Sequence, residues 1–92
     1  MAKSILQEDK RCWICGSVAE LECHHIMGGT ANRKLSEKYG LKVWLCHRHH
    51  TGPDGAQYNA DLNRDLKMDA QYAFEQKYGR VLWMQVFGKN YL

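Results

Sequence analysis

Two short stretches of sequence decide how this chain folds: CWIC at residues 12–15 and CHRHH at residues 46–50. In each stretch two metal-binding residues are separated by a gap of two, which lets one tight turn present both side chains to a single tetrahedral ion. Thiolate and imidazole groups are the usual ligands of structural zinc. The spacing therefore predicts one closed zinc site. Its ligands would be Cys12, Cys15, Cys46 and His49.

Three further histidines stand near these residues: the doublet His24 and His25, and His50, which follows the second stretch directly. Histidines beside a closed zinc site suggest a second, open site, where a metal ion keeps positions for water or substrate. The sequence thus indicates two metals, one that folds the chain and one that does chemistry. Because His49 and His50 are adjacent, they could exchange roles, and the spacing favours His49 for zinc.

The length of the chain, 92 residues, predicts a single domain over residues 1–92. At this size a hydrophobic core alone gives marginal stability. Structural zinc can supply about 10 to 16 kcal/mol of apparent binding free energy, which is comparable with a whole folding stability. We therefore expect the metal-free protein to be loosened or unfolded.

Four cysteines could instead form two disulfides, but residues 1–8 lack an apolar secretory segment and no apolar run approaches membrane-spanning length. A reducing cytoplasm without a membrane partner is the expectation, and metal binding by cysteine goes with it. Thirteen Lys and Arg against ten Asp and Glu give a formal charge of +3, which permits a polyanionic partner without requiring one.

Hydrophobic patterning predicts an α+β chain in three parts. These are an N-terminal arm or short helix over residues 1–10, a zinc core over residues 11–55 and C-terminal helices over residues 56–92. In the core we expect strands over residues 18–26 and 41–45, with a helical segment over residues 32–39 between them.

Beyond the turn signals of residues 51–55, apolar spacing predicts a long helix over residues 56–78 and a short one over residues 81–87. Gly79 is a plausible end for the long helix. The aromatic side chains of the last segment are expected to pack under it. They are Trp83, Phe87 and Tyr91.

The order of these features is a zinc pair, a strand that ends in His-His, a loop, a second strand, a second zinc pair and one more histidine. This order resembles the HNH, or ββα-metal, endonucleases. The stretches GTANR at residues 29–33 and FGKNYL at residues 87–92 look like small phage-encoded HNH proteins, some of them related to a RecA-dependent nuclease family. The resemblance covers nearly all of residues 11–92 and implies a small zinc-stabilised ββα-metal core with C-terminal helices packed on it.

The resemblance also implies roles for the three histidines outside the zinc site. In the family, the first histidine of the doublet binds the catalytic metal and the second is the general base, which carries over to His24 and His25. The histidine after the second zinc pair is a metal ligand, which carries over to His50. Neighbouring side chains on a strand leave the backbone in different directions, so one can face the ion and the other the attacking water.

The implied activity is that of a metal-dependent DNA endonuclease that hydrolyses phosphodiester bonds with Mg²⁺, Mn²⁺ or Ni²⁺, in the cytoplasm of a phage-infected or prophage-carrying bacterial cell. A basic edge near the doublet would grip the DNA backbone without reading its sequence, so specificity is expected to be low. This edge consists of Arg33, Lys34 and Lys38. An ordinary solvated face is an equally good reading of the same residues.

The sequence departs from the family in two places. The usual central asparagine is absent, since residues 40–43 read GLKV, and Asn32 is the candidate for its role of orienting the loop and the base. Gln57 stands near a position where phage relatives often carry a histidine, and glutamine is a poor metal ligand. Asp54, Asn59 or water would then complete the coordination.

Two alternatives remain open at this point. The chain could be a non-catalytic zinc module that binds DNA or protein, in which the two departures mark a decayed active site; this reading predicts no second metal. It could also be a phage recombination accessory nuclease, active only with a phage or host recombination protein. In every reading Cys23 is a small buried strand residue and not a ligand.

Overall fold

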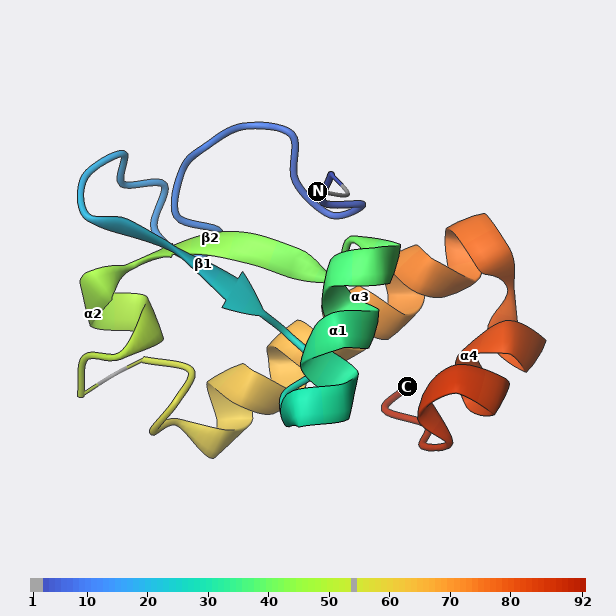
Figure 1. Ribbon diagram of the computed structural model, residues 1–92. Coiled ribbons are helices and arrows are strands. Elements are labelled where there is room, and N and C mark those ends of the chain that lie inside the picture. Colours follow the sequence, from blue (N-terminus) through green and yellow to red (C-terminus); the bar gives the residue numbers. More distant parts are fainter. Residues whose placement is uncertain (1–2, 54) are drawn as a thin grey trace.

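The computed structural model describes residues 3–53 and 55–92 of the chain. Within this part the protein is a small α+β fold, with a two-stranded antiparallel sheet and four helices (Figure 1). The strands are β1 (Leu21–His25) and β2 (Lys42–Cys46). The helices are α1 (Thr30–Tyr39), α2 (His47–His50), α3 (Ala60–Tyr78) and α4 (Arg80–Phe87). The predicted α+β class is confirmed.

The register of the two strands decides which way the His-His doublet points. His24 pairs with Val43, whereas His25 pairs with Lys42. Directly opposed residues of an antiparallel pair share a face, and successive residues alternate between faces. The two histidines therefore lie on opposite faces of β1, and His24 shares its face with the buried core residue Val43.

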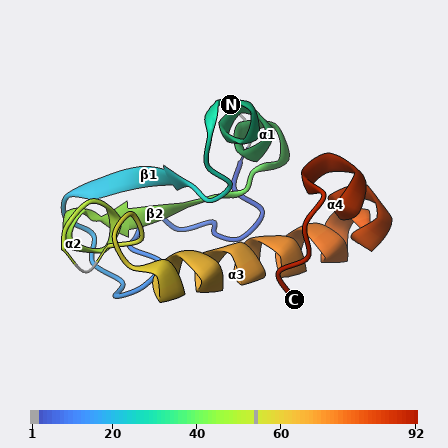
Figure 2. The ribbon, with the colours of Figure 1, turned by 90° about the horizontal axis from the view of Figure 1, so that it is seen from below.

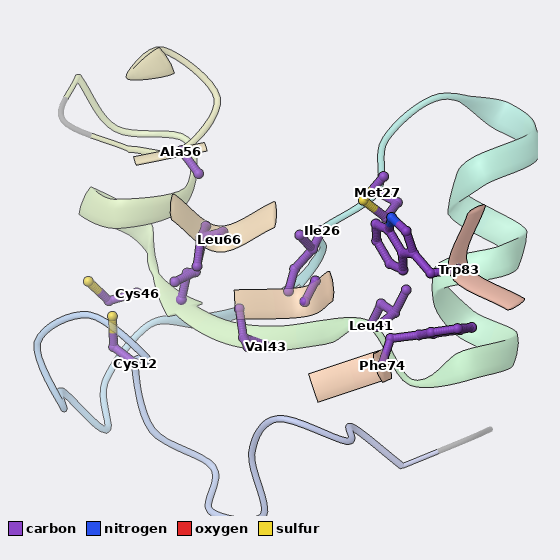
Figure 3. Packing of buried hydrophobic residues seen from close by; sticks show 12 residues of the cluster. Cys12, Ile26, Met27, Leu41, Val43, Cys46, Ala56, Leu66, Phe74 and Trp83 are labelled. Atoms are coloured by element: carbon purple, nitrogen blue, oxygen red, sulfur yellow. The ribbon is translucent and has the colours of Figure 1, made fainter. Parts of the chain in front are cut away.

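Helix α3 runs along one side of the strands, and α1 lies on the opposite side (Figure 2). The apolar positions of α3 recur at four-residue intervals, as the face of a helix against a core requires. Leu66, Ala70 and Phe74 are at most 1% exposed. They pack with side chains from the sheet and from α4 (Figure 3). Strand β2 contributes Val43 and Leu45 to this cluster, and Ile26 and Leu41 directly flank the two strands.

The last helix and the tail pack as the sequence predicts. Trp83 is fully buried, and its ring centroid lies 5.3 Å from that of Phe74 on α3 and 4.4 Å from that of Phe87. Tyr91 completes the group, with its ring 6.4 Å from Trp83. These edge-to-face and tilted contacts are the favoured geometries for aromatic rings. No helix in the described part of the chain is long and apolar enough to span a bilayer.

The N-terminal arm differs from expectation, because residues 3–10 form neither a helix nor a frayed end. The Ile5 amide donates to the carbonyl of Gly40 at 2.9 Å, and the Ser4 hydroxyl donates to the carbonyl of Lys42 at 2.5 Å. The side-chain oxygen of Gln7 accepts from the amide of Trp44 at 2.8 Å. The arm is therefore held along β2, where it satisfies backbone groups of a strand that has one strand partner.

Most predicted boundaries shift by one or two residues, and two shift further. Strand β1 begins at Leu21 and not at residue 18, because Glu20 has a φ of 53°, which is incompatible with an extended strand. Helix α3 begins at Ala60 and not at residue 56, because Asn59 caps it: its side-chain oxygen accepts from the Leu62 amide at 3.1 Å. At the other end, Gly79 follows the last residue of α3 with a φ of 88°, as predicted for a helix end.

Candidate functional site

Four metal-binding side chains come together at the end of the sheet where β1 begins and β2 ends. Cys12 and Cys15 lie on a tight turn, in which the Gly16 amide donates to the Cys12 carbonyl at 2.8 Å. Cys46 ends β2 and is also the N-cap of α2, so that His49 follows within one helical turn. The two short motifs thus form two turns that face each other.

The ligand atoms of Cys12, Cys15, Cys46 and His49 all lie within 4.8 Å of one another. The Sγ atoms of Cys15 and Cys46 are 3.8 Å apart, and His49 Nδ1 lies 3.2 Å from Cys46 Sγ and 3.8 Å from Cys12 Sγ. Tetrahedral zinc with Zn–S bonds of about 2.3 Å spaces its sulfur ligands about 3.8 Å apart. The predicted grouping is confirmed, and this Cys3His set can hold a metal ion in the manner of structural zinc.

The electrostatics of the cluster favour a thiolate at Cys12. Burial opposes ionisation of this thiol, but hydrogen bonds from the backbone at Cys46, Cys15 and Ile14 outweigh it and lower its pKa to about 6. The pKa of Cys46 is raised, first by burial and then by the neighbouring thiols. Cys12 therefore ionises more readily than Cys46. A bound divalent cation would favour the thiolate form of both.

The second group consists of His24 on β1 and His50 on α2. Their ring centroids are 5.1 Å apart in an edge-to-face arrangement. Among the buried side-chain nitrogen and oxygen atoms of residues 3–53 and 55–92, His24 Nε2 alone lacks a hydrogen-bond partner. Burial is the main cause that lowers the pKa of His24 to about 4, followed by the charge of His50. The imidazole of His24 is therefore neutral at physiological pH, which is the form that binds metals.

Glu22 orients the second histidine of this group. Its Oε1 lies 2.6 Å from His50 Nδ1, and its Oε2 lies 3.3 Å from Nδ1 of the exposed His47. These hydrogen bonds lower the pKa of the Glu22 carboxyl. A carboxylate on one ring nitrogen fixes the other nitrogen as an acceptor, which is how metal-binding histidines are commonly held. Nε2 of His50 is thereby the nitrogen left for a ligand.

His25 has a different environment on the opposite face of β1. Its Nε2 lies 2.9 Å from Glu37 Oε2 on α1. The same carboxylate accepts from Lys42 Nζ at 2.9 and 3.0 Å, and these two partners lower the pKa of Glu37, Lys42 more than His25. The structure thus brings His24 and His50 together and places His25 in a carboxylate and lysine network of its own.

The remaining predicted residues lie on α1. Asn32 is half-buried in the first turns, and its side chain makes no hydrogen bond within the described residues. Arg33, Lys34 and Lys38 are exposed, with Lys38 Nζ 5.2 Å from the ring centroid of Tyr39. The catalytic role of Asn32 and the DNA contacts of the three basic residues stay predictions.

The proposed substitutes for the missing family histidine are only partly described. Asp54 lies outside the described residues. The side chain of Asn59 is used as the cap of α3, so its oxygen is already engaged. The Gln57 amide donates to the His50 carbonyl at 3.2 Å, so the backbone at residue 57 lies directly beside the histidine pair. Cys23 stays outside the Cys3His group, and burial raises its pKa.

Two acidic residues of the site are absent from the sequence prediction. Glu22 could have been found, because it lies two residues before His24 and therefore on the same face of the strand. Glu37 gave no such signal, since its approach to His25 depends on how α1 packs beside β1.

No protein-family model, curated protein or solved structure matches this chain significantly, so the resemblance to HNH endonucleases stays a prediction.

Proposed function

We propose that this protein is a metal-dependent DNA endonuclease of the HNH, or ββα-metal, type. The observation that carries the proposal is the buried Nε2 of His24, which has no hydrogen-bond partner within residues 3–53 and 55–92 and lies beside the ring of His50. A buried polar atom without a partner costs free energy, and native proteins keep few of them. Two imidazoles from different elements suit a divalent ion and leave coordination positions for water and substrate.

The arrangement around this pair supports the finer fold assignment as well. Strand β1 is joined to its antiparallel partner β2 through α1, and His24 and His50 come from the first strand and from the helix after the second. That order of strand, strand and helix is the one the family resemblance implies. The neighbouring Cys3His set would stabilise the same segment from outside the histidine pair, which leaves the pair free to exchange ligands.

Each residue then has a role in phosphodiester hydrolysis. His25 acts as general base, and Glu37 accepts a hydrogen bond from its Nε2, which leaves Nδ1 unprotonated to take a proton from water. Lys42 holds Glu37 in place through both carboxylate oxygens. His24 and His50 would hold the divalent ion. When bound, such an ion supplies positive charge that stabilises the phosphate and the departing oxygen.

The strand geometry sets a requirement on the substrate. Because His24 and His25 lie on opposite faces of β1, the scissile phosphate must lie at the end of the strand, where both faces can be reached. A DNA backbone that crosses this end would run past the basic residues of α1 on the His25 side. Contacts to phosphates carry no sequence information, so low sequence specificity is expected.

A plasmid-nicking assay with Mg²⁺, Mn²⁺ or Ni²⁺ tests the proposal. Wild-type protein should relax supercoiled plasmid, and His25→Ala should slow this at least about 100-fold, the lower range of what a general base contributes. Tyr72→Ala removes an exposed ring on α3 and serves as the control that should cleave like wild type. Cleavage that is unchanged in His25→Ala would reject the mechanism.

The same assay separates the alternatives. A wild-type protein that is silent with all three ions, although it retains its zinc, would favour the non-catalytic zinc module. Cleavage that begins only when a phage or host recombination protein is added would identify an accessory nuclease. In both cases the Cys3His set would keep its structural role.

A further inference from the structure

A basic groove lies between α3 and the C-terminal tail. It is an open cavity of about 570 Å³. We call it the α3–tail groove; its lining residues with charged, amide or aromatic side chains include Tyr58, Asn63, Arg64, Lys67, Lys89 and Tyr91. The other described lining residues are uncharged, so within the described part of the chain the groove has three cationic side chains and no carboxylate.

The tail is fixed in this position by a fully buried polar residue. Gln71 on α3 accepts from the Tyr91 amide at 2.6 Å and donates to the side-chain oxygen of Asn90 at 2.8 Å. The Trp83 indole donates to the carbonyl of Lys89 at 2.8 Å. A buried glutamine is costly unless its hydrogen bonds are satisfied, and here they anchor the tail. The groove is therefore a built feature of the fold and not a chance gap.

Two of the three groove cations lie against one aromatic ring. Lys67 Nζ and Lys89 Nζ lie 5.5 and 5.3 Å from the centroid of the same ring, that of Tyr91. None of Arg64, Lys67 and Lys89 forms an ion pair within residues 3–53 and 55–92. Like charges held near each other repel, and an anion placed between them removes that repulsion. The arrangement thus favours a ligand with several negative charges.

The groove borders the backbone of His50. Gln57 lines the groove and its amide donates to the carbonyl of His50. A chain of phosphates that lies in the groove would therefore pass beside the backbone of His50.

We propose that the α3–tail groove binds the sugar–phosphate backbone of single-stranded DNA that leads away from the histidine pair. The three cations would contact phosphates, and the exposed ring of Tyr58, 68% accessible, would stack on a base. Basic side chains interleaved with aromatic rings are the usual means of holding a single strand. The choice of DNA as ligand rests on the proposed function, whereas the polyanion site rests on the groove itself.

The test compares two triple variants of equal net charge. R64Q/K67Q/K89Q removes the groove cations, and K10Q/R11Q/K77Q removes three cations from outside the groove. Binding of a fluorescent single-stranded oligonucleotide is followed by anisotropy on the zinc-containing protein without added divalent ions. The groove variant should lose at least about tenfold in affinity and about 2 units of salt slope, whereas the control should stay within about twofold of wild type.

Equal loss in both triple variants would overturn the groove as a site. Tyr58→Ala should weaken single-stranded DNA at least about threefold and leave duplex DNA unchanged, since stacking needs an unpaired base. Tighter binding of wild type to duplex, or to RNA of the same sequence, would overturn the assignment to single-stranded DNA. If the groove variant binds the oligonucleotide more weakly but wild type does not nick plasmid, this site is upheld and the nuclease proposal is rejected. If wild type nicks plasmid and the groove variant binds as tightly as wild type, the nuclease proposal is upheld and this site is rejected.

Discussion

Two groups of metal-binding side chains meet at adjacent residues, His49 and His50, and they differ in how complete they are. In the Cys3His cluster every ligand atom lies within 4.8 Å of the others, and the four atoms suffice for a tetrahedral ion. In the histidine pair one buried nitrogen has no partner within the described residues, and two rings leave further coordination positions open. A complete set holds its ion for structure, whereas an incomplete set can exchange ligands, which is what catalysis needs.

The largest expected effect tests whether the Cys3His cluster stabilises the fold. Cys12→Ser should cost at least about 4 kcal/mol, because loss of a metal site is among the most destabilising changes known. At about 4 to 8 °C per kcal/mol for a domain of this size, the melting temperature should fall by about 16 °C or more. Circular dichroism melting measures this.

Cys23→Ser is the matched control, since Cys23 is a cysteine of β1 outside the cluster. It should melt within a few degrees of wild type and retain its zinc. A similar fall in both variants would mean that burial of the thiols, and not ligation, stabilises the fold.

Metal content tests whether the histidine pair, His24 and His50, binds a second ion. After a brief chelator wash we expect one tightly held zinc per chain, and a second divalent ion that returns on addition of Mn²⁺ or Ni²⁺. His24→Ala should abolish the second binding event and keep the first, whereas His47→Ala, an exposed histidine, should keep both. Native mass spectrometry counts the ions, and a single class of site in wild-type protein would remove the distinction between the two groups.

A smaller effect is expected at Glu22. Glu22→Gln removes the charge that orients His50, and loss of such a supporting carboxylate weakens metal binding about 10- to 100-fold. Glu20→Gln, at an exposed neighbouring position, should leave the affinity unchanged. Titration calorimetry with Mn²⁺ measures both. Unaltered affinity in Glu22→Gln would show that the carboxylate has no part in the site.

The smallest effect is a pH dependence at Glu37. Its pKa is lowered in the folded chain by Lys42 and then by His25, so the carboxylate contributes stability above the ordinary glutamate range. That contribution is lost as the pH falls through the folded pKa. Because the side chain is 31% exposed, solvent screening keeps it below about 1 kcal/mol.

Urea unfolding of wild type and Glu37→Gln, compared at each pH, isolates this term, since loss of zinc at acid pH affects both proteins. The stability difference should be present above the ordinary glutamate range and shrink as the pH falls below that range. A difference that grows on acidification would give the contribution the opposite sign and contradict the assigned ion pair.

Much of the fold could be predicted because its signals are local. Paired ligands with a gap of two, alternating apolar residues and glycines at helix ends each act over a few residues, and they gave both strands and three of the helices nearly in place. The Cys3His set followed from spacing alone. Spacing favoured His49 over His50 as the zinc ligand but did not exclude the reverse. In the structure, His49 on α2 lies with the cysteines and His50 lies beside His24.

What could not be predicted depends on contacts between distant segments. The arm of residues 3–10 is ordered by β2, some 35 residues further on, so its own sequence carries no pattern for it. Gln71 reads as a surface position of a helix, yet it is fully buried because the tail folds back onto it. Glu37 meets His25 only through the packing of α1 beside β1.

Helix α2 is a single turn of four residues, and its two last histidines serve different groups. Each residue of an α-helix rotates the chain by about 100°. Deleting or inserting one residue between Cys46 and His49 would therefore turn the wrong imidazole toward the thiols and its neighbour away from β1. Over evolutionary time this segment should accept replacements more readily than changes of length, because a shift in helical phase would misplace the side chains of both groups at once.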